Sequence, residues 1–339
     1  MAKILAQLEG ILQAPPSMNG ANVEFQILGV KVVVTPTAEA RRRIRTTSEQ
    51  KRLRLDQLVD LTALPGRSEK GFTGCTAVVA GNYDTAAKFI EVAYPPTTPP
   101  GLPPDPPFEF HPFIRVGPPE SLLLGPWRNN GGKFFVNDVP VEVLKAADFV
   151  NTRLVPDVPK NEFAIPVDVD KIPDDAPVSV QGYPSTDGPT RFIGLAVVVN
   201  SLNPNILLDP DNPQVGIARA KGRNRRALFD LEVRGGVYTG RSVGGVVSPQ
   251  RITFQRLDPA GNLEGDPQGF ASITANAQPG GFDKWSISPK LTPVPPFLTA
   301  PVGVQATYVN APSGTPTDKW RDVEIRDDPK TPPTATTPP

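Results

Sequence analysis

Prolines recur so often along this chain that long helices are excluded from most of it. The 339 residues include 43 prolines and 29 glycines, together about 21% of the chain. Proline clashes with the preceding helical turn and lacks the N–H that a helix needs. Glycine does not recur at every third position, which excludes collagen, and the combined fraction stays below that of unperiodic disordered chains. The sequence therefore predicts an all-β protein with prolines in turns and linkers.

Charges and rare residues narrow the range of functions. Lysine and arginine number 35, as do aspartate and glutamate, so no net field draws the whole protein to nucleic acid or to an anionic membrane. The only cysteine is Cys75 and the only histidine is His111, which excludes an intrachain disulfide and a cysteine-based zinc site. We expect no catalytic residues, no metal and no cofactor.

The chain contains an internal repeat. Residues 9–94 and 121–199 each hold an opening strand pair, a variable middle, a glycine-centred strand and a closing strand. The copies are offset by 108 residues where Gly29 is matched with Asn137, and by 101 where Gly81 is matched with Gly182. Short strands of alternating polarity with glycines at the bends predict a small OB-like β-barrel for each copy.

The third region, 203–326, has about seven strand candidates separated by regular turns, a pattern typical of an immunoglobulin-like β-sandwich. Trp285 is the expected core tryptophan. The predicted organisation is: 1–94, the first barrel repeat with a basic insertion at 38–64; 95–120, a proline-rich linker and edge strand; 121–202, the second barrel repeat; 203–326, the sandwich; and 327–339, a disordered Pro/Thr-rich tail.

Two local predictions concern the segments around the first barrel. Residues 38–64 are the best helix candidate, with Asp56 capping a turn over 57–61. Paired prolines in 95–107 favour an extended, semi-rigid spacer. The alternating stretch 108–115 after it predicts a strand, and Pro112 within it favours a sheet edge.

The stretch from Leu64 to Asp84, with Gly71-Phe-Thr-Gly74 and Gly81-Asn-Tyr83, resembles an uncharacterised group of bacterial hypothetical proteins. The second copy, with Asn137-Asp-Val-Pro-Val and Lys160-Asn-Glu-Phe, is similar to the same group. The resemblance implies two small β-barrel repeats followed by an immunoglobulin-like domain. It implies no activity.

A basic run gives the strongest local charge signal. Residues 41–54 carry seven positive charges and one negative charge, a net of +6. Such a loop on an OB-like barrel can bind the phosphates of a single strand, and the alternative is a solvated insertion. Single-strand binders add stacking aromatics, and near this loop Phe72 and Tyr83 are the candidates. The candidate nucleic-acid-binding residues are Arg41, Arg42, Arg43, Arg45, Lys51, Arg52 and Arg54.

Acidic residues cluster at 168–175 and at 209–211. Calcium prefers several oxygen ligands, but neither cluster has the EF-hand spacing. Ordinary aspartate turn chemistry is the better interpretation.

Two functions fit these features. The first is a non-enzymatic structural or interaction protein that binds other proteins or itself, for example as a filament or surface subunit, since neutral charge and extended segments suit assembly. The alternative is single-stranded nucleic-acid binding by the first barrel. The sequence predicts no membrane span, and because it shows no signal peptide the default location is the cytoplasm, with the cell surface open if a leader was removed.

Overall fold

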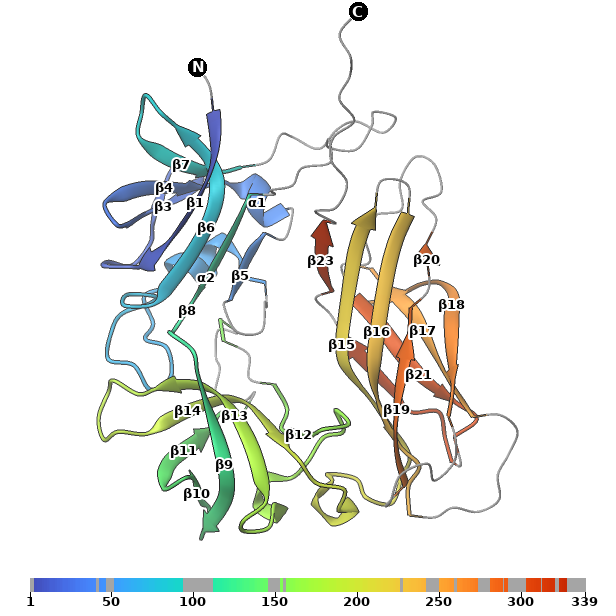
Figure 1. Cartoon of the computed structure of the whole chain (residues 1–339). Coiled ribbons are helices and arrows are strands. Elements are labelled where there is room, and N and C mark those ends of the chain that lie inside the picture. Colours follow the sequence, from blue (N-terminus) through green and yellow to red (C-terminus); the bar gives the residue numbers. More distant parts are fainter. Residues whose placement is uncertain are drawn as a thin grey trace, which may run out of the picture. The chain divides into compact units, whose positions relative to one another are not determined.

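The computed structural model describes residues 3–40, 43–46, 52–93, 112–145, 153–154, 157–225, 228–241, 250–258, 261–273, 281–288, 290–291, 303–311, 313–320 and 323–327. Strands dominate this part of the chain, which confirms the predicted all-β class (Figure 1). The chain separates into two compact units, one with both barrels and the other with most of the sandwich. No helix in the described ranges is long and apolar enough to cross a membrane.

The second repeat closes into a five-stranded barrel. Antiparallel ladders join each neighbouring pair except one, and a parallel ladder between the third and fifth strands completes the ring. In chain order the ring reads 1-2-3-5-4, which is the Greek-key order of an OB-type barrel. The ring strands are β9 (Ser121–Asn130), β10 (Lys133–Val136), β11 (Val139–Val143), β13 (Pro177–Pro184) and β14 (Phe192–Val199), with β12 (Lys160–Asn161) parallel to β14 and the 3-10 helices η2 (Val169–Lys171) and η3 (Pro204–Ile206) nearby.

The first repeat has the same strand order but is only half closed. Its third and fifth strands again pair in parallel, and its first and fourth again pair antiparallel. In the described residues, the first and second strands are joined by one isolated bridge, between Leu12 and Ile27. The strands are β1 (Lys3–Ile11), β3 (Asn22–Ile27), β4 (Val30–Val34), β6 (Thr76–Asp84) and β7 (Phe89–Val92), with β2 (Ser17–Asn19) beside β3.

Matching hairpins correct the predicted alignment of the repeats. The β3–β4 turn consists of Leu28 and Gly29, and the β10–β11 turn of Asn137 and Asp138, all four with positive φ. Two left-handed residues in a two-residue loop make a type I′ turn, whose twist suits a hairpin. Leu28 therefore corresponds to Asn137, an offset of 109 residues, and the predicted match of Gly29 with Asn137 was wrong by one position.

The other predicted match, Gly81 with Gly182, agrees with the strand pairing. A Cβ on Gly81 would lie 2.5 Å from the carbonyl oxygen of Glu91, and one on Gly182 would lie 1.8 Å from that of Ile193. Each glycine therefore allows its strand to approach the backbone of the fifth barrel strand closely, β7 in the first barrel and β14 in the second.

The helix predicted over 38–64 is wrong. The described residues there form α1 (Pro36–Ala40), β5 (Ile44–Thr46) and α2 (Leu55–Val59). The β-branched Ile44 and Thr46 both face inward and favour a strand. Arg54, not Asp56, is the N-cap of α2, and its N–H donates to the Gln57 side chain at 3.0 Å.

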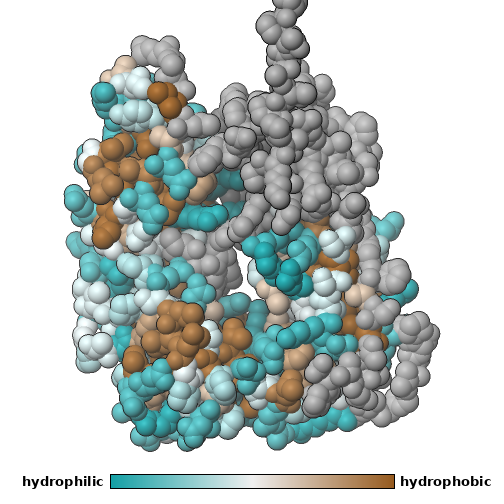
Figure 2. All heavy atoms as spheres, in the orientation of Figure 1, coloured by the Kyte–Doolittle hydropathy of each residue, from teal (hydrophilic) through white to brown (hydrophobic). Residues whose placement is uncertain are grey.

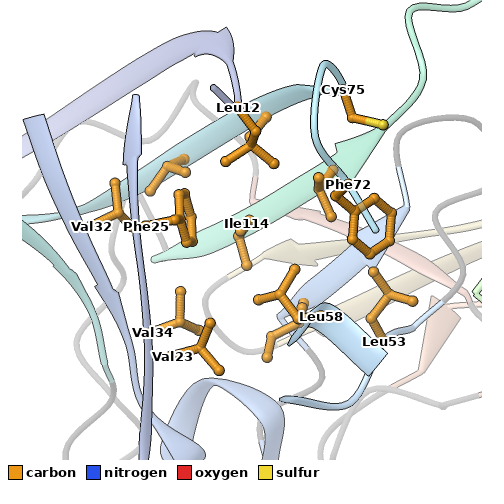
Figure 3. Close-up of a cluster of buried hydrophobic side chains, with 14 of the residues drawn as sticks. Leu12, Val23, Phe25, Val32, Val34, Leu53, Leu58, Phe72, Cys75 and Ile114 are labelled. Atoms are coloured by element: carbon orange, nitrogen blue, oxygen red, sulfur yellow. The ribbon is translucent and has the colours of Figure 1, made fainter. Parts of the chain in front are cut away.

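The same segment is built into the core of the barrel rather than lying outside it. Figure 3 shows Leu58 near Ile114 and Val34, and Leu53 beside Phe72, within one cluster of buried side chains. All of these side chains are buried. The segment predicted as a basic insertion therefore closes the side of the first barrel.

The strand predicted at the edge lies inside the sheet. β8 (Phe113–Gly117) pairs with β6 on one side and with β5 on the other, so β5 is the edge strand. Pro112 precedes the strand, so the ladder keeps all of its hydrogen bonds. β7 and β8 both pair with β6, and together they take the place that β14 fills in the second barrel. The proline-rich stretch 95–107 and His111 lie outside the described residues.

The C-terminal region is a two-sheet sandwich, as predicted. One sheet has the order β19-β16-β15-β23, with β20 also paired to β16, and the other has the order β18-β17-β21-β22. Trp285 is buried as expected, and its indole N–H donates to the Gly236 carbonyl at 3.0 Å. The strands are β15 (Gln214–Arg225), β16 (Leu228–Tyr238), β17 (Arg251–Leu257), β18 (Leu263–Ser272), β19 (Phe282–Ile287), β20 (Lys290–Leu291), β21 (Gly303–Val309), β22 (Thr317–Trp320) and β23 (Glu324–Asp327).

Candidate functional site

Four arginines lie on the outer face of the first barrel. The parallel register of β5 and β8 places Arg45 beside Arg115, and an isolated bridge places Arg52 beside Arg45. Arg43 precedes Arg45 by two residues, so strand alternation puts it on the same face, and its carbonyl accepts the Ile114 N–H at 2.9 Å. All four side chains are half-buried. We call them the arginine face.

Buried neighbours fix the direction of these side chains. Ile44 follows Arg43 and Ile114 precedes Arg115, and both isoleucines are fully buried. Leu53, which follows Arg52, is buried too. Since successive strand residues point to opposite sides, the arginines point outward.

The structure brings together only part of the predicted basic site. Arg54 is exposed and pairs with Asp56 at 2.8 Å, a hydrogen bond that raises the pKa of Arg54 and lowers that of Asp56. Arg41, Arg42 and Lys51 lie outside the described residues. The arginine face therefore keeps three of the seven predicted residues, Arg43, Arg45 and Arg52, and gains Arg115.

Among the described residues, Phe113 is an aromatic residue on this face. The Arg115 guanidinium lies 5.2 Å from the centroid of the Phe113 ring, and the ring is half-buried. Phe72, one of the expected stacking residues, is fully buried, and Tyr83 pairs across the sheet with Ile4, away from the arginines. Phe113 was missed because it is distant in sequence, and only the pairing of β8 with β5 brings it close.

Where β9, β13 and β14 of the second barrel lie side by side, their outward residues carry no charge, and Arg128 lies further along β9, beyond its pairing with β13. One row across these strands consists of Leu124, Ser179 and Val198, and the next consists of Leu122, Gln181 and Ala196. The exposed fractions are 56% for Leu122, 61% for Leu124 and 42% for Val198. Pro126 and Pro177 extend the face. We call it the uncharged face, and Figure 2 shows a brown area over these strands in the lower part of the view.

The positions of Leu122 and Leu124 are polar in the first barrel. Gly81 pairs with Ala6, and its counterpart Gly182 pairs with Ser121. Counting along β1 and β9 from these pairs, Gln7 corresponds to Leu122 and Glu9 to Leu124. Both Gln7 and Glu9 are exposed. The two copies therefore share a fold but differ in the chemistry of this face.

A buried arginine joins the barrels. Arg153, from the second repeat, is 4% exposed. Its guanidinium donates to the carbonyls of Asp60 (3.0 Å) and Thr62, and lies 5.5 Å from the centroid of the Phe72 ring. Its Nε is 3.7 Å from the Asp60 carboxylate. Burial lowers the pKa of Arg153, but a guanidinium remains charged.

Further hydrogen bonds join the 65–69 loop of the first repeat to the second. The Tyr183 hydroxyl donates to the Pro65 carbonyl at 2.7 Å. The Thr186 hydroxyl donates to Glu69 at 2.8 Å and accepts the Ser68 N–H at 3.1 Å. These hydroxyl, carboxylate and backbone groups form hydrogen bonds with one another, and those hydrogen bonds hold the two repeats together.

Cys75 and Arg67 lie buried behind this junction. Burial, the main cause, raises the pKa of the Cys75 thiol to about 12, so it is a neutral thiol at physiological pH. Arg67 donates to the Thr73 carbonyl at 3.2 Å and pairs with Glu69 at 3.2 Å. This environment is typical of a packed thiol rather than a nucleophile.

The carboxylates of the acidic cluster at 168–175 accept hydrogen bonds from backbone N–H groups in turns. Asp168 caps η2 by accepting the Asp170 N–H at 3.1 Å, and Asp174 accepts the Asn129 N–H at 2.9 Å. Within the described ranges, no group of three or more His, Cys, Asp or Glu side chains is arranged to hold a metal ion.

Comparisons with known proteins give no relative. No family model, no curated protein and no solved structure matches the chain. Its function must therefore be argued from its own surfaces.

Proposed function

We propose that this protein is a non-enzymatic interaction protein that pairs with a second copy of itself through the uncharged face of its second barrel. The observation that carries the proposal is the set of outward side chains in the rows where β9, β13 and β14 pair, none of which is charged. The solvent side of a half-buried sheet normally carries polar residues. Contiguous exposed apolar surface marks an interaction site.

The internal repeat provides a comparison within one chain. At the positions of Leu122 and Leu124, the first barrel carries Gln7 and Glu9. The shared fold therefore does not require apolar residues there, and an exposed leucine gains nothing from water. A partner surface that removes these leucines from water accounts for their presence.

A second copy is the partner that fits best. A two-fold interface presents the same patch on both sides, so the patch must tolerate itself. A face without charge meets its own copy without like-charge repulsion, and a net formal charge of zero adds no long-range repulsion between copies. One self-complementary face yields a closed pair, whereas a filament would need a second contact surface.

Sedimentation velocity over a dilution series of the full chain tests the proposal. We expect the wild type to pass from dimer to monomer on dilution, and Leu122→Lys/Leu124→Lys to remain a monomer. The matched control is Gln7→Lys/Glu9→Lys at the corresponding positions of the first barrel, which should dimerise as the wild type does. Circular dichroism melts check that the variants are folded.

Two outcomes would refute this function. A wild type that stays monomeric at every concentration would exclude pairing, and equal loss of pairing in both lysine doubles would show that charge, rather than this face, is responsible. Pairing that survives Leu122→Lys/Leu124→Lys would move the interface elsewhere.

A further inference from the structure

We propose that the arginine face of the first barrel binds single-stranded nucleic acid, with Arg43, Arg45, Arg52 and Arg115 contacting phosphates and Phe113 stacking on a base. This inference uses a different barrel and a different surface from the pairing proposed above. It therefore stands or falls independently of that function.

The first step is the register of the arginines. Arg52, Arg45 and Arg115 occupy one row across adjoining strands. Neighbouring strands are about 4.8 Å apart, so three positive charges follow one another at that spacing. Arg43 adds a fourth charge on the same face.

The second step is the energetic cost of this row. Like charges placed directly opposite one another across strands destabilise a sheet. The corresponding row of the second barrel contains Pro166, Lys160 and Val198, with a single charge. The fold therefore does not need three arginines in this row, and three guanidinium groups side by side suit an anionic ligand.

The third step is the capacity of the arginines for a ligand. A guanidinium carries five N–H donors in a planar fork that matches phosphate oxygens. The side chains are half-buried, so their stems are held while part of each remains accessible.

The fourth step identifies the ligand as a single strand. The Phe113 ring lies among the arginines, with the Arg115 guanidinium 5.2 Å from its centroid. Every base has a π-face that can stack on such a ring, and basic grooves with stacking aromatics are typical of single-strand binders. In a duplex the bases are stacked on one another, and the ring would have no base to receive.

Fluorescence anisotropy with labelled oligothymidylate, at about 50 mM and about 200 mM KCl, tests the site. We expect binding at the lower salt that weakens steeply at the higher. In Arg45→Gln/Arg115→Gln the slope of log affinity against log salt should fall by about 0.7 for each phosphate that the variant no longer neutralises. Phe113→Leu should weaken binding at least about fivefold with little change in slope.

The matched control is Lys160→Gln, which removes the one charge from the corresponding row of the second barrel and should leave binding unchanged. Thermal melts of the free variants separate binding from folding.

Three results would overturn the inference. The first is the absence of salt-dependent binding, and the second is binding that the double arginine variant leaves intact. The third is equal affinity for heparin and oligothymidylate together with no effect of Phe113→Leu. That result would show a surface that binds polyanions without reading bases.

Discussion

Arg153 shows how a single side chain can serve structure where its chemistry suggests a site. A buried guanidinium beside a cysteine and a carboxylate, here Cys75 and Asp60, has the composition of an active centre, yet its donors end on the carbonyls of Asp60 and Thr62. A buried charge is expensive unless its hydrogen bonds are made. Here they are made to the backbone of the other repeat, so the residue joins the two barrels.

Cys75 makes the stability of the barrels depend on alkaline pH. Its folded-state pKa is raised from 9.0 to about 12, chiefly by burial. The folded state therefore keeps its proton when the unfolded state has lost it. The stabilisation is complete below pH 9.0 and is lost as the pH rises toward 12.

We therefore expect Cys75→Ala to be less sensitive to alkali than the wild type. At about 1.5 pH units above the unfolded pKa, the thiol accounts for a loss of about 2 kcal/mol, since one unit corresponds to 1.36 kcal/mol. Urea unfolding at neutral pH and at this higher pH measures the loss in each protein. Equal losses would show that Cys75 is not the group responsible.

At the scale of elements, the β3–β4 hairpin has an unfavourable residue at its tip. Leu28 has a φ of 50° and is 69% exposed, whereas the second barrel has Asn137 at this position. Type I′ turns favour Asn and Gly because left-handed backbone strains other side chains. The strain is of the order of 1 kcal/mol.

Exchanging these turn residues should change stability in opposite directions. We expect Leu28→Asn to raise the free energy of unfolding by about 1 kcal/mol. Asn137→Leu should lower it by more, because Asn137 also donates to the Leu124 carbonyl. Chemical denaturation of both variants measures the changes, and a loss of stability in Leu28→Asn would mean that contacts of Leu28 outweigh its strain.

Local pattern predicted some elements well and failed where tertiary contacts decide. The alternation in 251–257 predicts β17 with its observed bounds. Residues 38–64 read as a helix, but Ile44 and Leu53 instead fill the open side of the first barrel. Here burial of side chains outweighs local helix propensity, and burial depends on tertiary contacts that a single sequence does not reveal.

For a related reason, only part of the candidate site could be predicted from the sequence. The basic run was evident, but its three described arginines acquire their partners Arg115 and Phe113 only through the parallel pairing of β5 with β8. The uncharged face could not be predicted from the sequence, because its residues come from three strands whose register only the structure shows.

At the scale of the molecule, the two barrels share one core. Tyr183, Ile193 and Leu195 of the second barrel pack in one buried cluster with Phe72 and Leu64 of the first. The sandwich has a separate cluster. Domains that share a core lose it together, so the two repeats should unfold as one cooperative unit although each has its own sheet.

Tryptophan fluorescence can test this cooperativity, because Trp127 is buried in the second barrel and the other two tryptophans can be replaced. In a Trp285→Phe/Trp320→Phe background, Trp127 reports on the second barrel. We expect Phe72→Leu, a change in the first barrel, to lower the urea midpoint of the Trp127 signal by the equivalent of about 1.5 kcal/mol, the usual upper cost of a hydrophobic exchange of similar volume.

The control for this experiment is Phe254→Leu, an equally buried change in the sandwich, which should leave the Trp127 midpoint where it was. If Phe72→Leu also leaves it unchanged, the two barrels unfold independently and the contacts of Arg153 and Tyr183 do not couple them. If both changes lower it, cooperativity extends beyond the shared core of the barrels. A shift with Phe72→Leu alone would make the double barrel, rather than the single repeat, the unit that folds.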